Sequence, residues 1–260
     1  MHLVTKGHLF ITGSSRSGTT TMADFLRCDR RIVMGRERYA WRLKQPGAFT
    51  PALFEKQRFC LEFSSEDSHH ARPQPYYRQA WAYFDDAIWI GDKLPRLTEY
   101  YDVLDRWFPD CRVIHMLREP YAVALSYQRR ADATRRRGGA GRRDWPVERG
   151  WQAAMAEWNS ANRNTLENLR RGRPVFVLDY EGLYRQGLQL QRLYDFLGLA
   201  LPTAMVEQWQ ASGSERDGIE ARRTEPDDIA LREAVDAATD HASYQALKMH
   251  GPVAPRTGDR

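Results

Sequence analysis

The sequence has few of the residues that mark a secreted, metal-binding or membrane-spanning protein. Three of its 260 residues are cysteine, and Cys28, Cys60 and Cys111 are too sparse for a disulfide framework or a metal cluster. The seven histidines show no metal-ligand spacing. No apolar run approaches the ~20 residues of a transmembrane helix, and the opening residues do not resemble a signal peptide. We therefore expect a cytoplasmic protein with no metal and no membrane span.

Length and charge narrow the class of protein further. Hydrophobic residues make up 42% of the chain, which excludes disorder throughout. We expect one domain over residues 1–250, followed by a disordered tail over the Pro- and Gly-containing residues 251–260. The formal net charge of +5 suits an anionic ligand but is too small to indicate nucleic acid by itself.

The hydrophobic pattern predicts an α/β fold. Five short apolar runs predict buried strands at residues 8–12, 31–34, 87–91, 112–117 and 174–179. Helical periodicity covers residues 19–28, 95–108, 121–131, 145–171, 181–197 and 227–238. Strands that alternate with helices predict a central, mostly parallel sheet between two helical layers, a three-layer sandwich. Ligands of such folds bind at the carboxyl ends of the strands.

A phosphate-binding loop is predicted between the first strand and the first helix. The run from residue 13 to residue 20 is Gly-Ser-Ser-Arg-Ser-Gly-Thr-Thr. Gly13 and Gly18 allow a tight turn, so that backbone amides and the helix N-terminus face an anion. Hydroxyl groups follow at Ser17, Thr19 and Thr20, and Arg16 adds a fixed positive charge.

This loop departs from the loop that binds nucleoside triphosphates. Thr19 follows Gly18 where that pattern has a lysine, and the cation stands two residues before the glycine instead. An atypical nucleotide-dependent kinase stays an alternative, because Thr20 could hold magnesium together with Asp92 or Asp179.

The loop resembles the 5′-phosphosulfate loop of sulfotransferases, closer to the carbohydrate and bacterial types. The resemblance implies the donor 3′-phosphoadenosine 5′-phosphosulfate (PAPS), the product adenosine 3′,5′-bisphosphate (PAP) and a reaction without metal. It places Arg16 on the bridging and sulfuryl oxygens. It places Ser17, Gly18, Thr19 and Thr20 around the 5′-phosphate, and Ser14 and Ser15 are further donor-binding residues of the loop.

A second half of the donor site is expected about 100 residues later. The strand over 112–117 leads into Arg118-Glu-Pro, and Ser126 follows eight residues after the arginine. This spacing is similar to the family's 3′-phosphate site, where Arg supplies a fork of N–H groups and Ser a hydroxyl. We expect the N-termini of the two helices to face the two phosphates. After the strand over 174–179, Tyr180 resembles a family residue that approaches the adenine, although packing on the sheet would also explain it.

Three residues are the candidates for catalysis: Glu37, Arg16 and Lys93. Glu37 follows the second strand, where the resemblance implies a glutamate base that takes the acceptor proton; pairing with Arg36 and Arg38 is the alternative. Lys93 lies in Gly-Asp-Lys-Leu-Pro, similar to a family stretch whose lysine points at the sulfuryl group. A surface lysine before a proline turn is the other explanation. The alternative bases are His69, His70 and His115.

The acceptor is expected to be a hydroxyl or amine of a small molecule or carbohydrate. Aromatic side chains that could line its site, or fill the core, are Tyr39, Trp41, Phe49, Phe54, Tyr76, Tyr77, Trp81, Tyr83 and Phe84. An arginine-rich segment, residues 135–149, predicts a basic loop near the 3′-phosphate. The rival hypothesis is a non-catalytic nucleotide- or RNA-binding protein that uses residues 129–149. We expect no nucleic-acid partner.

Overall fold

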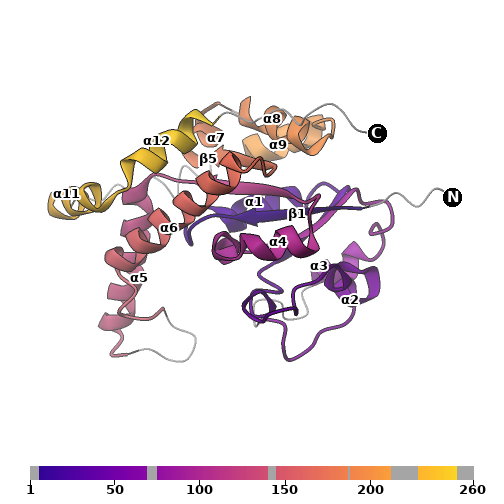
Figure 1. Ribbon diagram of the computed structural model, residues 1–260, viewed down its shortest axis with the longest axis horizontal. Coiled ribbons are helices and arrows are strands. Elements are labelled where there is room, and N and C mark those ends of the chain that lie inside the picture. The colour runs from indigo at the N-terminus through magenta and orange to yellow at the C-terminus, as the bar shows by residue number, and fades with distance from the viewer. Residues whose placement is uncertain (1–5, 69–74, 140–144, 187, 212–227, 251–260) are drawn as a thin grey trace.

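A five-stranded parallel sheet forms the centre of the structure (Figure 1). The computed structural model describes residues 6–68, 75–139, 145–186, 188–211 and 228–250. Its strands are β1 (Gly7–Thr12), β2 (Ile32–Arg36), β3 (Trp89–Lys93), β4 (Arg112–Leu117) and β5 (Val175–Asp179). They lie in the order β2-β3-β1-β4-β5, and each neighbouring pair is parallel. All five predicted strands and the parallel sheet are confirmed.

Helices connect and cover the strands. The α-helices are α1 (Thr19–Leu26), α2 (Lys56–Cys60), α3 (Pro75–Ala80), α4 (Tyr101–Trp107), α5 (Pro120–Arg136), α6 (Trp151–Arg170), α7 (Tyr180–Gln186), α8 (Leu188–Leu197), α9 (Thr203–Ala211), α11 (Ile229–Ala238) and α12 (His241–Met249). Short 3₁₀ helices are η1 (Arg42–Lys44), η2 (Pro51–Phe54) and η4 (Pro95–Glu99). Among the described helices, none combines the length and apolar character needed to cross a membrane.

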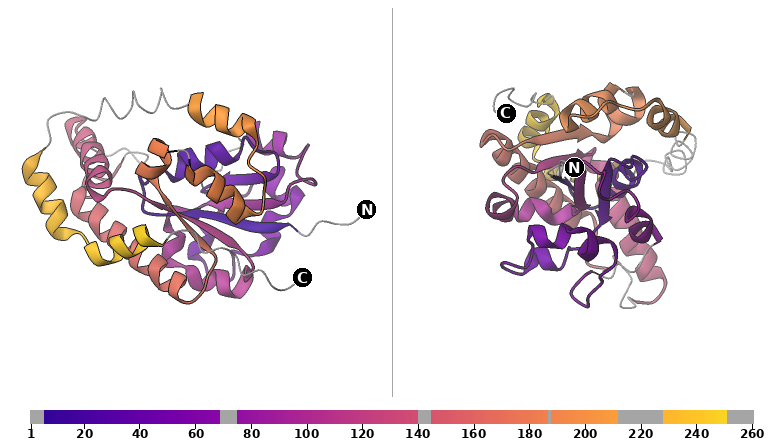
Figure 2. Two further views of the ribbon diagram at one scale, coloured as in Figure 1. Left: turned by 90° about the horizontal axis from the view of Figure 1, so that it is seen from above. Right: turned by 90° about the vertical axis from the view of Figure 1, so that its right-hand side faces the viewer.

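The core divides between the two faces of the sheet because side chains alternate along each strand. Leu9 and Ile11 of β1 pack with α1, α8 and α9, whereas Phe10 packs with residues of α2, α3 and α4. Figure 1 shows α8 and α9 above the sheet and α4 below it, and Figure 2 shows the same layers from two other sides. A further apolar cluster around buried Trp158 joins α5, α6, α11 and α12. The three-layer α/β architecture is confirmed.

The predicted helical segments are helical in the structure, but several begin, end or divide at other residues than predicted. The segment over 95–108 divides into η4 and α4, because the backbone of Tyr100 leaves the helical region at φ −135°. The segment over 181–197 likewise forms α7 and α8. α5 extends through Arg136, so the predicted basic loop over 135–149 begins inside a helix. Residues 140–144 of that loop, and the tail over 251–260, lie outside the described residues.

The edge strand β2 is covered by two adjacent tyrosines from α3. The Tyr76 hydroxyl accepts from the Met34 amide at 2.9 Å, and the Tyr77 hydroxyl accepts from the Arg36 amide at 3.4 Å. These contacts satisfy outward amides that an edge strand would otherwise expose. They fix the end of β2, from which the chain continues into Glu37.

Candidate active site

The predicted phosphate loop is a closed turn between β1 and α1. Gly13 has φ 138° and Gly18 has φ 92°, values that favour glycine. The Ser17 hydroxyl donates to the Ser14 carbonyl at 2.7 Å, and the Ser17 amide donates to it at 3.2 Å. A Cβ at Gly13 would lie 2.6 Å from the Met116 carbonyl oxygen, so the loop packs directly against β4. Gly18 is the N-cap residue of α1 and has no side chain to cover the first amides of the helix.

The two predicted halves of the donor site meet at this loop. Arg16 Nε donates to Ser126 Oγ of α5 at 3.1 Å. Arg118 Nη1, at the carboxyl end of β4, donates to the Arg16 carbonyl oxygen at 3.1 Å. Tertiary folding therefore joins residues that are 110 and 102 positions apart in the chain.

The Tyr180 ring packs against the Arg118 side chain. Arg118 is 3% exposed, and its guanidinium lies 4.1 Å from the centre of the Tyr180 ring. The same ring covers Gly18, where a Cβ would lie 2.5 Å from it. Trp158 Nε1 donates to the Arg118 carbonyl oxygen at 3.0 Å and fixes the backbone there. Tyr180 thus contacts both halves of the donor site; its approach to an adenine stays a prediction.

The N-terminus of α5 differs from the expectation that it faces a phosphate. Glu119 caps this helix, because its carboxylate accepts from the amides of Tyr121 at 3.1 Å and Ala122 at 2.7 Å. A carboxylate already occupies the position that an anion would take. The expectation was wrong for α5, and the donors at this end of β4 are the side chains of Arg118 and Ser126.

Glu37 and Lys93 form an ion pair at the ends of β2 and β3. Lys93 is 3% exposed, while the Glu37 side chain keeps 28% of its surface exposed. The Glu37 amide also donates to the Lys93 carbonyl oxygen at 2.8 Å. The explanation of Lys93 as a surface lysine is therefore wrong, because its ammonium is enclosed beside a carboxylate.

The arginines on either side of Glu37 turn away from it. Arg36 pairs with Asp24 of α1, and Arg38 is fully buried, with Asp67 as its ion-pair partner at 3.5 Å. The alternative role of Glu37, pairing with its arginine neighbours, is not the arrangement observed. Its carboxylate pairs with a lysine 56 positions later in the chain.

The Glu37–Lys93 pair lies at the carboxyl end of the sheet, where the phosphate loop also lies. Lys93 stands opposite Ile11 in the register of β3 and β1. The Leu94 amide donates to the Ile11 carbonyl at 2.8 Å, and the Thr12 hydroxyl donates to the Pro95 carbonyl at 3.0 Å. The carboxyl end of β3 is thus fastened to the carboxyl end of β1, where the loop begins at Gly13.

Backbone strain falls on two of the predicted catalytic residues. Within the described ranges, the non-glycine residues with positive φ are Arg16, at 73°, and Glu37, at 54°. This left-handed conformation costs free energy for residues with a Cβ, and such residues concentrate at functional sites. The strain is a signal independent of the sequence motifs, and it falls at the same two positions.

His115 is enclosed in a buried polar network. Its Nε2 lies 2.9 Å from Asn162 Oδ1 and its Nδ1 lies 3.1 Å from Thr165 Oγ1, which in turn lies 3.1 Å from the Tyr101 hydroxyl. Burial lowers the pKa of His115 to about 4. A ring with both nitrogens engaged and no exposed surface is a poor base for an acceptor. The other candidates, His69 and His70, lie outside the described residues.

Sequence reasoning missed a polar group that supports the loop from α5 and α6. The Tyr127 hydroxyl lies near the Ser15 side chain, donates to Glu157 at 2.6 Å and accepts from Arg149 at 3.4 Å. Arg149 pairs with Glu157, so the end of the predicted basic loop is anchored close to Ser15. The number of arginines in that loop was the signal in the sequence for such a contact, but it could not show which arginine pairs with Glu157.

Asp92, one of the two acidic residues offered for magnesium, points into the turn that follows β2. Asp92 is fully buried, and its Oδ2 accepts from the Tyr39 amide at 2.9 Å. Among the residues that the structure describes, no group of three or more His, Cys, Asp or Glu side chains could hold a metal ion. At the end of β3, the Asp92 carboxylate is therefore not placed to bind the magnesium ion that a kinase would need.

The parallel sheet, the glycine- and hydroxyl-rich loop and the two arginines define an α/β enzyme of the phosphate-loop class. The sequence matches the family model described as "Sulfotransferase family" over residues 8–203, more than half of the chain. The chain therefore belongs to the sulfotransferase family, and its reaction class is sulfuryl transfer. Curated proteins include no match to this sequence.

Solved structures show the same fold. The sulfotransferase domain from the curacin biosynthetic pathway aligns with a TM-score of 0.52 and 20% identity, over 77% of this chain and 77% of that one. Sulfotransferase STF9 from Mycobacterium avium aligns with a TM-score of 0.51 and 15% identity, over 96% of this chain and 79% of that one. At these identities the likeness concerns the arrangement of helices and strands.

Proposed function

We propose that the protein binds PAPS at the phosphate loop and transfers its sulfuryl group to a hydroxyl or amine of a small-molecule or carbohydrate acceptor. The observation that supports this most is the convergence of Arg16, Arg118 and Ser126. Two arginines and a hydroxyl from three different elements meet through hydrogen bonds of 3.1 Å at the start of α1. Such a set suits a ligand with two separate anionic groups.

The chemistry of the loop fits the phosphates of PAPS. The groups gathered there are hydrogen-bond donors: backbone amides of the loop and α1, the hydroxyl of Thr19, and two guanidinium groups, while the Ser17 hydroxyl closes the loop on the Ser14 carbonyl. In this proposal residues 14–20 hold the 5′-phosphate, and Arg118 and Ser126 hold the 3′-phosphate. The Tyr180 ring packs against the Arg118 guanidinium and keeps it in place.

Catalysis in this proposal is divided among Arg16, Lys93 and Glu37. When bound, PAPS supplies an activated sulfuryl group with PAP as the leaving group. Arg16 and Lys93 are positive groups that stabilise negative charge on the oxygen between sulfur and the 5′-phosphate. The Glu37 carboxylate takes the proton that the acceptor hydroxyl or amine loses.

The Glu37–Lys93 ion pair prepares both groups for these roles. The contact orients the carboxylate, since the ammonium that holds it is itself 3% exposed and fixed on β3. A carboxylate accepts through two oxygens, so Glu37 can keep Lys93 at one oxygen and receive a proton at the other. The same contact keeps Lys93 at the edge of the sheet beside the phosphate loop.

Titration calorimetry with PAP in excess chelator tests the donor site directly. Binding under these conditions, together with sulfate transfer from labelled PAPS in a screen of sugars, phenols, amines and lipids, is the expected result. Undetectable binding of PAP that is restored by magnesium would contradict the proposal, because the donor groups here need no bridging cation. Stabilisation by ATP with magnesium, and not by PAP, would favour a kinase instead.

A further inference from the structure

Asp92 is a fully buried carboxylate beside the proposed catalytic pair. It directly precedes Lys93 on β3 and stands opposite Gly35 of β2 and Phe10 of β1 in the sheet register. A Cβ at Gly35 would lie 2.5 Å from Asp92 Oδ1, so the absence of a side chain at Gly35 makes room for the carboxylate. Burying a carboxylate is costly, so its position beside a glycine that makes room for it indicates a specific task.

The Asp92 carboxylate binds the backbone that follows Glu37. Its Oδ2 accepts from the Tyr39 amide at 2.9 Å, and the Arg38 amide lies close enough to favour the charged form of the carboxylate. The next residue of β3, Lys93, accepts from the Glu37 amide at 2.8 Å through its carbonyl oxygen. Two consecutive residues of β3 therefore hold the amides of Glu37 and Tyr39, and the strained Glu37, with φ 54°, is the first of the two.

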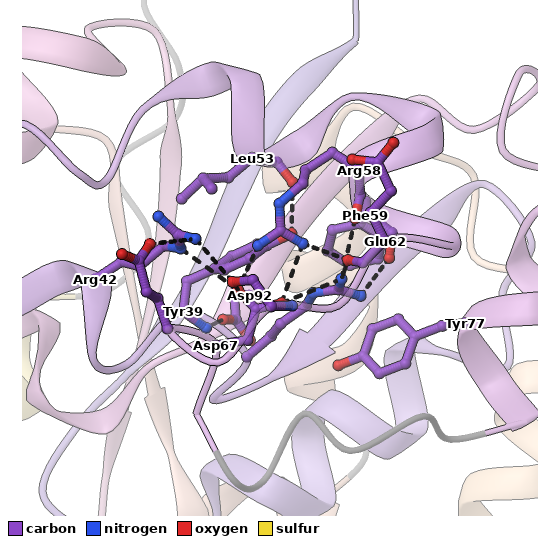
Figure 3. A network of polar contacts seen from close by, with 12 residues as sticks. Tyr39, Arg42, Leu53, Arg58, Phe59, Glu62, Asp67, Tyr77 and Asp92 are labelled. Atoms are coloured by element: carbon purple, nitrogen blue, oxygen red, sulfur yellow. Dashed lines mark hydrogen bonds and ion pairs between the residues drawn. The ribbon is translucent and has the colours of Figure 1, made fainter.

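The outer side of this turn is anchored by side chains of Arg38 and Tyr39. The Arg38 guanidinium donates to the Phe59, Arg58 and Glu62 carbonyl oxygens and lies 4.0 Å from the centre of the Phe63 ring. The Tyr39 hydroxyl donates to the Leu53 carbonyl at 2.6 Å. Figure 3 shows Asp92 next to Tyr39 within this network, with Arg58 and Asp67 around it. The turn is held on both sides, and Asp92 is the contact on the side of the sheet.

We propose that Asp92 is a positioning residue that holds the left-handed turn at Glu37 and thereby aims the Glu37 carboxylate at Lys93 and the acceptor. This inference rests on the proposed role of Glu37 as the base. The hydrogen bond from the Tyr39 amide to Asp92 opposes the relaxation of Glu37 toward an ordinary backbone conformation, which would carry its carboxylate away from Lys93. Asp92 contacts neither the donor nor the acceptor in this arrangement.

The charge state of Asp92 is separate from its positioning role. The ionisable groups around it are Lys93 and Glu37 at the strand ends, Arg38 and Tyr39 in the turn, and Tyr77 of α3. Burial raises the pKa of Asp92 to about 7, while the two amides and Lys93 act in the opposite direction. Since Oδ2 can accept from the Tyr39 amide whether or not the carboxyl group carries a proton, positioning requires the acceptor oxygen and not the charge.

The first test compares Asp92→Ala with Asp92→Asn. Asp92→Ala removes the acceptor oxygen, and we expect turnover to fall on the order of 10- to 100-fold, since a misplaced catalytic group costs rate in this range. The affinity for PAP should stay unchanged. Asp92→Asn keeps an acceptor oxygen, so its turnover should stay within a few-fold of the unmodified protein. Thr165→Val, which disrupts the separate buried network of His115, is the control for a loss of stability alone, and its turnover should not fall.

The second test uses Gly35 as an independent means of moving the Asp92 carboxylate. Gly35→Ala places a methyl group against Oδ1 and should lower turnover, even if Asp92→Ala does not fold. In the Asp92→Ala background the same methyl group has room, so Gly35→Ala should cause little further loss. Additive losses from the two substitutions would mean that Gly35 acts through something other than Asp92 and would overturn the proposed contact.

Glu37→Gln separates this inference from the proposed function. If Asp92 acts through Glu37, Asp92→Ala should cost little extra turnover in a Glu37→Gln background. Normal turnover by Glu37→Gln alone would refute the base assignment. Impaired turnover by Glu37→Gln with normal turnover by Asp92→Ala would refute the role of Asp92 and leave the base in place. Equal losses for Asp92→Asn and Asp92→Ala would also overturn it, because they would show that the charge matters and the acceptor oxygen does not.

Discussion

Arg118→Ala is the sharpest test of the donor site, because this arginine has several contacts and one proposed ligand. In the free protein its guanidinium donates to the Arg16 carbonyl oxygen and stacks on Tyr180. The substitution removes the fork of N–H groups proposed for the 3′-phosphate and leaves the backbone contact with Trp158 in place. The 3′-phosphate is remote from the reacting sulfur and is bound equally before and during the reaction.

The expected loss is one of binding. With 3% exposure, Arg118 would meet a phosphate where water screens the charges little, and removal of one partner of such a pair costs about 2–4 kcal/mol. This corresponds to roughly a 30- to 900-fold weaker Kd for PAP. Turnover at saturating donor should stay near that of the unmodified protein, because uniform binding does not lower the barrier from the bound state.

Calorimetry with PAP gives the Kd, and sulfate transfer at saturating PAPS gives the turnover. Arg112→Ala is a matched control, since Arg112 lies at the opposite end of β4, stacks on Trp89 at 4.8 Å and donates to the Phe196 carbonyl. Like Arg118, Arg112 contacts an aromatic ring and a backbone carbonyl, but it lies at the amino end of the sheet. Its removal should leave the Kd for PAP unchanged. Normal PAP binding by Arg118→Ala, or equal weakening by both substitutions, would refute the assignment of the 3′-phosphate site.

Three further predictions concern the catalytic groups and Asp92. Arg16→Ala and Lys93→Ala should each lower turnover by roughly 10²–10³ with smaller changes in PAP affinity, because their charges act on an oxygen that becomes negative in the transition state; near-normal turnover by Lys93→Ala would leave this lysine a structural partner of Glu37. Glu37→Gln should lower turnover by about 10²–10⁴ and flatten the acidic limb of the pH–rate profile, with PAP binding unchanged. Asp92 should affect stability with a definite sign: a native pKa of about 7 against 3.8 means that the folded state binds this proton more tightly, so its contribution to stability falls as pH rises from about 4 to 7. The free energy of unfolding of the unmodified protein, relative to Asp92→Asn, should therefore decrease over this range by at most about 4 kcal/mol, and parallel curves for the two proteins in urea unfolding would contradict the buried charge.

Much of the fold could be predicted because its signals are local in the chain. The strands are short apolar runs, and the loop at residues 13–20 has glycines where the backbone requires positive φ at Gly13 and Gly18. The spacing from Arg118 to Ser126 is also local, because it is set by one strand end and two turns of the following helix. Short helices such as α2 and α3 escaped prediction, since five or six residues show too little periodicity.

The pairing of side chains could not be read from the sequence. Arg36 and Arg38 are the nearest cations to Glu37 in the chain, yet they pair with Asp24 and Asp67, while Lys93 reaches Glu37. The chain leaves β2 at Arg36 and turns at Glu37, whose φ is 54°, so the side chains of Arg36 and Arg38 leave this turn toward different elements. In the same way Glu119, an unremarked residue of the Arg-Glu-Pro run, became the cap of α5.

The amino-acid sequence is enough to predict the class of fold, the phosphate loop and the candidate residues of the donor site, because each depends on residue types at fixed local spacing. The tertiary structure decided which of those residues act together. Parallel strands run in the same direction, so their carboxyl ends lie together at one end of the sheet. The long crossovers between them place these ends far apart in the chain. At this end of the sheet Arg118 contacts Arg16, 102 positions away in the chain, and Lys93 contacts Glu37, 56 positions away. The register of the strands and the direction of the side chains fix both contacts.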